Sequence, residues 1–273
     1  MSAIAALMIA AAPAVATATF HPVEGVTYIA DTVVTRIDDG VTRRFHTARH
    51  IVFRRDGDGY LVEAVLQKAD QQAPGAGQAF TKGNDALTGR TVRYRVDASG
   101  AVTAIEDIDT LIELIAEQIE KSAPDPARGA MFARPLRTAG PEQRRAMLAS
   151  FIAPLIGAAD AHRAEGRRPV TLPPQPPMPV GSGLPGEEVV TRDRAGILSI
   201  ETRASGPITG PADIPGGSTA TGSITLTLLR RIDPATGLLV ESRSETTTVT
   251  AGPGAARTGK SETLITFRPA VSR

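Results

Sequence analysis

The sequence predicts a mainly β protein of the α+β class, a curved antiparallel sheet or half-barrel with two helices inserted between two blocks of strands. Three observations lead to this fold. Residues 23–67 are rich in strand-forming Val, Ile, Thr, Tyr and Phe, and the chain is predicted to be β again from 187 to 267. Apolar residues alternate with other residues at 60–66, 92–96 and 224–232, as in strands with one wet face. Turns rich in Asp and Gly separate these strands. Between the two blocks the apolar residues change to helical spacing.

The strand blocks are expected to consist of hairpins. A strand runs from Val41 to Arg55, and Asp56-Gly57-Asp58-Gly59 closes the first hairpin because Gly and Asp tolerate the positive φ of tight turns. Residues 92–96 alternate apolar residues with arginines before a turn at 97–100. The same Asp-led turn recurs at 233–237. This recurrence indicates hairpin construction rather than a repeated binding unit.

Two helices are predicted near 107–122 and 141–156. The first has an apolar stripe at helical spacing and Asp107 as a plausible N-cap. Pro154 should end or kink the second helix, and residues 129–136 between the helices are interpreted as a short apolar loop. The stripe of the first helix consists of Ile108, Leu111, Ile112, Ile115 and Ile119.

Two further segments are interpreted as loops. Residues 166–186 contain seven prolines, which favours an extended surface loop within one domain over a linker between domains. Residues 207–222 are rich in Gly and Pro and are also expected to form a loop. We therefore expect residues 19–273 to form a single β-rich domain.

The first 18 residues resemble a secretory signal peptide. Ile4 to Ala12 are apolar, Pro13 breaks the run, and two A-x-A patterns follow over residues 14–18. No Lys or Arg precedes the run, so an alanine-rich buried helix of a cytosolic domain is the alternative. Export would place the chain in the periplasm or outside the cell, soluble after removal of residues 1–18 and without a cysteine for a lipid anchor.

Composition limits the classes of function. The 273 residues include 30 basic and 29 acidic side chains, no Cys and no Trp. A disulfide scaffold and a thiolate site are therefore excluded, and duplex nucleic acid is not an expected partner at a net charge of +1. After residue 18 no apolar run reaches the length of a membrane-spanning helix, so we expect no stable membrane span.

One motif resembles a phosphate-binding loop. Residues 254–261 fit G-x-x-x-x-G-K-[ST], with Gly254, Gly259, Lys260 and Ser261 at the defining positions. A working loop of this kind must lead into a helix N-terminus, whereas residues 262–268 alternate as a strand. We interpret the motif as a chance match in a hairpin loop and predict no nucleotide or other cofactor.

The sequence offers no clear metal or catalytic site. His46 and His50 have a metal-binding spacing for a helix, but along a strand such residues lie about 13 Å apart. No G-x-S-x-G nucleophile motif is present. Paired carboxylates such as Asp38-Asp39 fall at turns. We therefore predict no metal site and no catalytic residue.

Four apolar residues are candidates for lining a ligand site. Met131 and Phe132, with Met147 and Phe151, would lie where the helices cover one face of the sheet. An apolar ligand could occupy the space if the packing is loose. The alternative is that these side chains simply fill the core.

The order of elements from Val23 to Phe267, after an apolar leader, is similar to that of periplasmic lipoprotein-carrier (LolA/LolB-like) proteins. The resemblance implies an unclosed β-barrel with a helical lid over an apolar cavity that ferries acyl chains. The hairpin at residues 92–100 also resembles uncharacterised secreted β-rich bacterial proteins.

These observations favour an exported, non-enzymatic protein that binds an apolar or lipid ligand. The alternative is a structural or interaction protein of the cell envelope that pairs through edge strands, with the Thr-rich strand at 245–250 as an example. A hydrolase is a third hypothesis. The expected partner is accordingly an apolar small molecule or an envelope protein.

Overall fold

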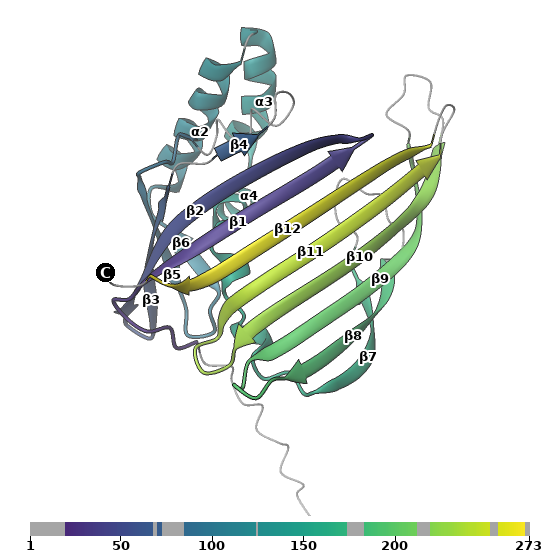
Figure 1. Ribbon diagram of the computed structural model, residues 1–273. Helices are drawn as coiled ribbons and strands as arrows, with labels where there is room; N and C mark the ends of the chain where they lie inside the picture. Colours follow the sequence, from purple (N-terminus) through teal and green to yellow (C-terminus); the bar gives the residue numbers. More distant parts are fainter. Residues whose placement is uncertain are drawn as a thin grey trace, which may run out of the picture.

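The fold was analysed in a computed structural model (Figure 1), which describes residues 20–67, 70–72, 85–123, 125–173, 183–211, 219–251 and 256–270. The predicted signal peptide and Gly254 of the loop motif lie outside the described residues.

The described strands form one antiparallel sheet that is not closed, with the helices between two strand blocks, and this confirms the predicted fold class. Eleven strands follow the order β6-β5-β3-β2-β1-β12-β11-β10-β9-β8-β7, and β4 pairs with β2 beside this path. The first block comprises β1 (Thr27–Asp38), β2 (Val41–Asp56), β3 (Gly59–Leu66), β4 (Asp70–Gln72), β5 (Thr91–Val96) and β6 (Val102–Ile105). The second block comprises β7 (Gly166–Leu172), β8 (Leu184–Arg192), β9 (Leu198–Pro211), β10 (Thr219–Asp233), β11 (Leu238–Ala251) and β12 (Arg257–Pro269).

The two blocks meet in the middle of the sheet. Here β1 pairs with β12. Tyr28 lies opposite Pro269 at one end of this pairing, and Asp38 lies opposite Gly259 at the other. Ala270 extends this pairing by donating its backbone N–H to the carbonyl of Thr27 at 2.7 Å. The first and last described strands are therefore neighbours, while β6 and β7 form the two edges.

The helical segment contains three α-helices rather than the predicted two. They are α2 (Ile108–Ser122), α3 (Pro126–Thr138) and α4 (Pro141–Ala149), followed by short 3-10 turns at Ala153–Leu155 and Ala158–Asp160. The first predicted helix is confirmed as α2. The side chain of Asp107 does not cap this helix. The residue has a left-handed φ of 52°, and its carboxylate accepts no hydrogen bond from a backbone N–H of the first turn.

The predicted apolar loop at residues 129–136 is wrong, because these residues belong to α3. This helix packs on α2 through small residues, which a search for large apolar residues overlooks. A Cβ at Gly129 would lie 3.0 Å from the Cα of Glu120, so only glycine allows this close approach. The predicted helix at 141–156 is too long: α4 ends at Ala149, and Pro154 falls within a 3-10 turn.

Two predicted loops are partly strands. Residues 166–172 form β7, and Pro169 is tolerated there because β7 is an edge strand that needs ladder bonds on one side only. Likewise β9 continues to Pro211 and β10 begins at Thr219, within the predicted loop at 207–222. Residues 174–182 and 212–218 lie outside the described residues.

The Asp-led turns are confirmed. The Asp97 carboxylate accepts a hydrogen bond from the hydroxyl of Ser99 and bonds from the N–H groups of Ser99 (2.9 Å) and Ala101 (3.0 Å). These hydrogen bonds hold the pKa of Asp97 below its ordinary value. Asp233 accepts from the N–H of Ala235 at 3.0 Å. The turn at Asp193 is of the same kind, although the sequence search did not single it out.

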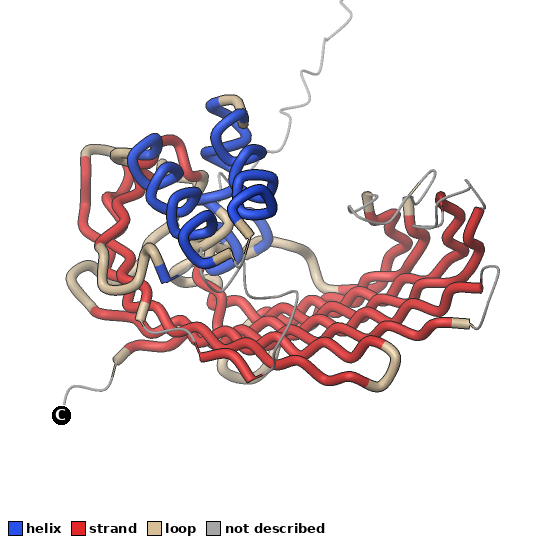
Figure 2. Tube along the Cα trace, turned by 90° about the horizontal axis from the view of Figure 1, so that it is seen from above, coloured by secondary structure: helices blue, strands red, loops and turns tan. Residues whose placement is uncertain are grey.

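The main hydrophobic core lies between the helical segment and one face of the sheet, which we call the inner face. Tyr28, Ala30, Ile51 and Phe53 project from this face and are buried. Leu148, at the end of α4, belongs to the same core. Figure 2 shows that the helices lie over one end of the sheet and that the other end curves towards the same side.

Candidate ligand-binding face

We call the inner face beyond the helices the open region, and we define it by the residues that lie opposite one another across the strands. Partners directly opposite in an antiparallel pair project from the same face. One row runs from Glu188 across seven strands, from β8 to β2. Its other members are Thr202, Leu228, Ser244, Thr263, Val34 and Phe45. Apart from Glu188, no member of this row is ionisable.

The next row towards the far end of the strands is also uncharged from β8 to β12. It consists of Gly186, Ala204, Leu226, Thr246 and Ser261. The opposite face of the same strands differs sharply: on β11, Glu241, Arg243 and Glu245 alternate with the inner hydroxyl residues. From β8 to β12 the open region therefore presents apolar side chains and hydroxyls, whereas on β1 and β2 the second row ends at Arg36 and Arg43.

The open region has a small hydrophobic cluster of its own. Leu184, Ala204 and Ile224 are buried, and Leu172 and Leu226 pack against them partly buried. These residues come from β7 to β10 and are separate from the main core. No described helix lies over this end of the sheet (Figure 2). Because Leu184, Ala204 and Ile224 are already buried, the partly buried Leu172 and Leu226 are the members that a further apolar molecule can contact.

A network of buried charges marks one side of the boundary between the core and the open region. The carboxylate of Glu188 lies 2.6 Å from Nη1 of Arg163 and accepts a hydrogen bond from Nε of Arg168 at 2.8 Å. Asp160 accepts from Arg163 at 2.6 Å and also pairs with Arg230. Burial alone would raise the pKa of Glu188, but the hydrogen bonds from Arg168 and Arg163 lower it overall.

A buried arginine marks the other side of this boundary, on β2. Arg49 is 8% exposed and donates from Nη2 to the Thr32 hydroxyl at 2.7 Å and from Nη1 to the Phe151 carbonyl. Its guanidinium also lies 5.9 Å from the centre of the Phe151 ring. Burial lowers the pKa of Arg49, and the nearby Tyr94 opposes this effect. Its Nε has no hydrogen-bond partner among the described residues.

The boundary is thus cationic, with four arginines against two carboxylates. The adjoining surface combines leucine and isoleucine side chains with serine and threonine hydroxyls. Such a surface can bind a long apolar chain by desolvation, and the hydroxyls can accept or donate hydrogen bonds to polar atoms along it.

The four candidate ligand-lining residues are divided into two pairs. Met131 (60% exposed) and Phe132 (48% exposed) project from α3 into solvent. Met147 and Phe151 pack partly buried against the main core, and Phe151 contacts Arg49 at the boundary. Their role in ligand binding remains a prediction. The residues of the open region were missed because their shared face depends on pairing between distant strands.

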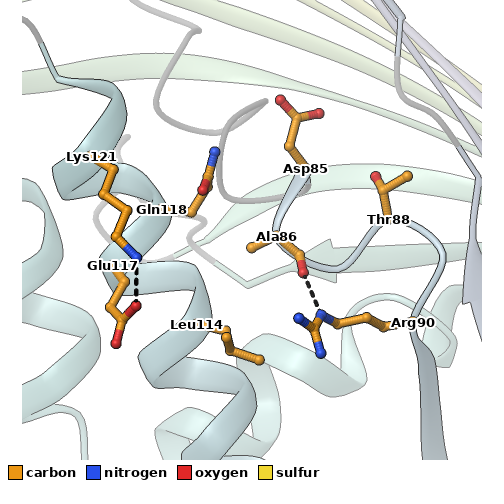
Figure 3. Close-up of a pocket in the computed structure, with 8 residues that line it drawn as sticks. All are labelled: Asp85, Ala86, Thr88, Arg90, Leu114, Glu117, Gln118 and Lys121. Carbon is orange, nitrogen blue, oxygen red and sulfur yellow. Dashed lines mark hydrogen bonds and ion pairs between the residues drawn. The ribbon is translucent and has the colours of Figure 1, made fainter.

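A separate pocket of about 350 Å³ lies between α2 and residues 85–90 (Figure 3). Its lining is mostly polar. Lys121 pairs with Glu117 at 2.8 Å, and Nε of Arg90 donates to the Ala86 carbonyl at 3.1 Å. Leu114 is the single large apolar residue among the described residues that line it. This pocket suits an apolar ligand less well than the open region does.

The histidine pair lies on a strand, as expected. His46 and His50 belong to β2, where His46 faces Asp31 at 3.4 Å and His50 faces Gln67 at 3.4 Å. The described residues contain no group of three side chains that could hold a metal ion.

The phosphate-loop motif leads into a strand rather than a helix. Gly259, Lys260 and Ser261 lie on β12, as the sequence indicated. The Lys260 ammonium pairs with Glu245 at 3.1 Å and with Glu262 at 2.8 Å. The free N–H groups of a helix N-terminus, on which such a loop depends, are not available at this position.

Comparison with known proteins places the chain in no family: no protein-family model and no curated protein match it. Within the described ranges, none of the helices has the length and apolar character needed to cross a membrane.

Proposed function

We propose that this protein is an exported, non-enzymatic carrier or binding protein whose open region holds an apolar chain, such as the acyl chain of a lipid. The observation that supports the proposal most directly is the second hydrophobic cluster, which lies on the inner face beyond the described helices. Two cross-strand rows that are uncharged from β9 to β12 extend this surface. The cationic boundary would favour a ligand whose polar end is anionic.

Fatty-acid uptake tests this proposal. The protein should increase the emission of a fluorescent fatty acid, and native mass spectrometry of material from its own source should show a bound lipid. Leu226→Glu places a charge on the inner face and should abolish uptake, because burying an unpaired carboxylate is costly. The matched control is Val249→Glu on the outer face of β11, where the side chain is 41% exposed. Uptake that is absent, or equal in both variants, would exclude this binding face.

The alternative of pairing through edge strands has less support. The Thr-rich segment at 245–250 belongs to β11, which pairs with β10 on one side and β12 on the other, so this strand is not an edge. Among the described strands, the edges are β4 with three residues, β6 with four, and β7, whose Pro169 removes a ladder donor. We therefore favour the binding proposal over edge pairing.

A further inference from the structure

Helix α3 is attached to the rest of the molecule on one side only. It packs mainly on α2, through Gly129 and Ala133, which are buried. Arg137 strengthens this contact by pairing with Glu113 at 2.7 Å and donating to Glu120 at 3.0 Å. The α2–α3 pair extends beyond the ends of the strands (Figure 1). The remaining surface of α3 is therefore free to meet another body without obstruction by the sheet.

The exposed face of α3 combines apolar and basic side chains. Met131 and Phe132 are the most exposed large apolar residues of the described helices. Arg128 precedes them by one helical turn and Arg134 follows Met131 by three positions, so all four share an exposed side. Neither arginine forms an ion pair with another described residue, and α3 contains no Asp or Glu.

We propose that this face of α3 docks on the surface of a bilayer that contains anionic lipids. Arginines flanking exposed apolar side chains are typical of helices that lie at a membrane interface, where the charges meet lipid phosphates and the apolar groups enter the acyl boundary. A protein groove would instead require apolar anchors at i, i+3, i+4 and i+7, whereas Met131 and Phe132 are adjacent and form a single wedge. This docking goes beyond ligand binding and does not require it.

The absence of tryptophan makes the proposal directly measurable. Phe132→Trp introduces a single tryptophan into a chain that has none, and its emission can be excited selectively over that of the three tyrosines. With vesicles of phosphatidylglycerol and phosphatidylcholine, its emission should shift to shorter wavelength and be quenched by brominated acyl chains. Leu264→Trp is the matched control, at an exposed apolar position of β12, and should not respond. A local reporter is needed because the apolar residues 4–12 could bind vesicles on their own.

The charge contribution can be separated from the apolar one. In the Phe132→Trp background, Arg128→Gln with Arg134→Gln should weaken binding to anionic vesicles roughly thirtyfold, about fivefold for each arginine. Phosphatidylcholine alone should bind both proteins weakly and equally. Met131→Ser should lower binding to either vesicle. Because these side chains are exposed, the circular dichroism and melting temperature of the variants should match the parent.

Three outcomes would overturn the proposal: no emission shift with anionic vesicles, an equal shift for Leu264→Trp, or binding that is unaffected by the two arginine substitutions. A shift with soluble polyglutamate but none with vesicles would also overturn it, by assigning the face to an acidic protein. Vesicle docking without fatty-acid uptake would leave the membrane contact intact while excluding the ligand proposal.

Discussion

The inner face has a covered region beneath the helical segment and the open region beyond it. The same strands form both regions, but the residues on their inner face differ in kind. On β9, Leu198 and Ile200 enter the main core beneath the helical segment, whereas Thr202 and Ala204 continue the same face into the open region. On β11, Leu238 and Leu239 belong to the core, and the inner positions beyond them are serines and threonines. A single strand thus contributes to the hydrophobic core at one end and to the open region at the other.

The boundary between these regions carries the buried charges of the inner face. Arg49, Asp160, Glu188 and Thr202 are the buried polar residues of the described chain, and all lie at or beside this boundary. Buried charges are tolerated when they are paired and hydrogen-bonded. Here Asp160 and Glu188 pair with arginines, and Arg49 donates to a hydroxyl and to a backbone carbonyl. The residues along each strand therefore determine where the hydrophobic core ends as well as how the sheet pairs.

The largest expected effect comes from truncating a core residue in the covered region. Leu148→Ala should lower the free energy of unfolding by about 2–5 kcal/mol, because it leaves a cavity beside α4. Leu226→Ala, at a partly buried site of the open region, should cost only about 1 kcal/mol. Urea unfolding of both variants measures the difference. Equal losses would show that the open region is packed like core.

The boundary network should give the next largest effect. Glu188→Gln removes the charge that pairs with Arg163 and Arg168 while nearly keeping the side-chain volume. We expect a loss of about 1–3 kcal/mol, below the full cost of an unpaired buried charge because both arginines are partly exposed. Chemical denaturation checks this value. A stability equal to that of the parent would mean that the network does not stabilise the boundary.

A smaller effect is expected at Arg49. Arg49→Lys keeps the charge, but a single ammonium cannot reproduce the planar fork that reaches both Thr32 and Phe151. The loss of one hydrogen bond should cost about 1 kcal/mol in a thermal or urea melt. As a control, Arg54→Lys changes an exposed arginine of the same strand and should have almost no effect. Equal losses at both positions would contradict the role assigned to Arg49.

The smallest expected effect is a change in the stability of the protein at acidic pH. Because the folded-state pKa of Glu188 is lowered from 4.5, its ionisation contributes stability above the unfolded pKa, and this contribution is lost as the pH falls through the folded pKa. The parent should therefore lose more stability below about pH 4.5 than Glu188→Gln does. Glu142→Gln, at a carboxylate 81% exposed, should keep the acid profile of the parent. Parallel acid profiles for the parent and Glu188→Gln would refute this linkage.

Local sequence patterns predicted the elements that bury large apolar residues. The stripe of α2 and the alternation of β3, β5 and β10 are examples, since the spacing of their apolar residues indicates which side faces the core. Helix α3 was missed because its contact relies on Gly129 and Ala133, which carry no large apolar signal. Strand β7 was missed because Pro169 argues against strands in general, although not against an edge.

The candidate site could not be predicted in the same way. Leu226, Thr246 and Ser261 lie side by side only because β10, β11 and β12 pair in one register. The hairpin turns fix part of that register, but the pairing of β1 with β12 brings together residues from opposite ends of the chain. Met131 and Phe132, which the sequence indicated as ligand-lining residues, lie instead on a solvent-exposed face of α3.

The central pairing of β1 with β12 has a consequence for how the protein folds. Within each block, most strands pair with a neighbour in the chain and can form rapidly as hairpins. Tyr28, by contrast, must find Pro269, more than two hundred positions away. Such a contact closes a loop almost as long as the chain, and non-local pairing of this kind slows folding. We expect the two strand blocks to form early and their junction to set the overall rate of folding.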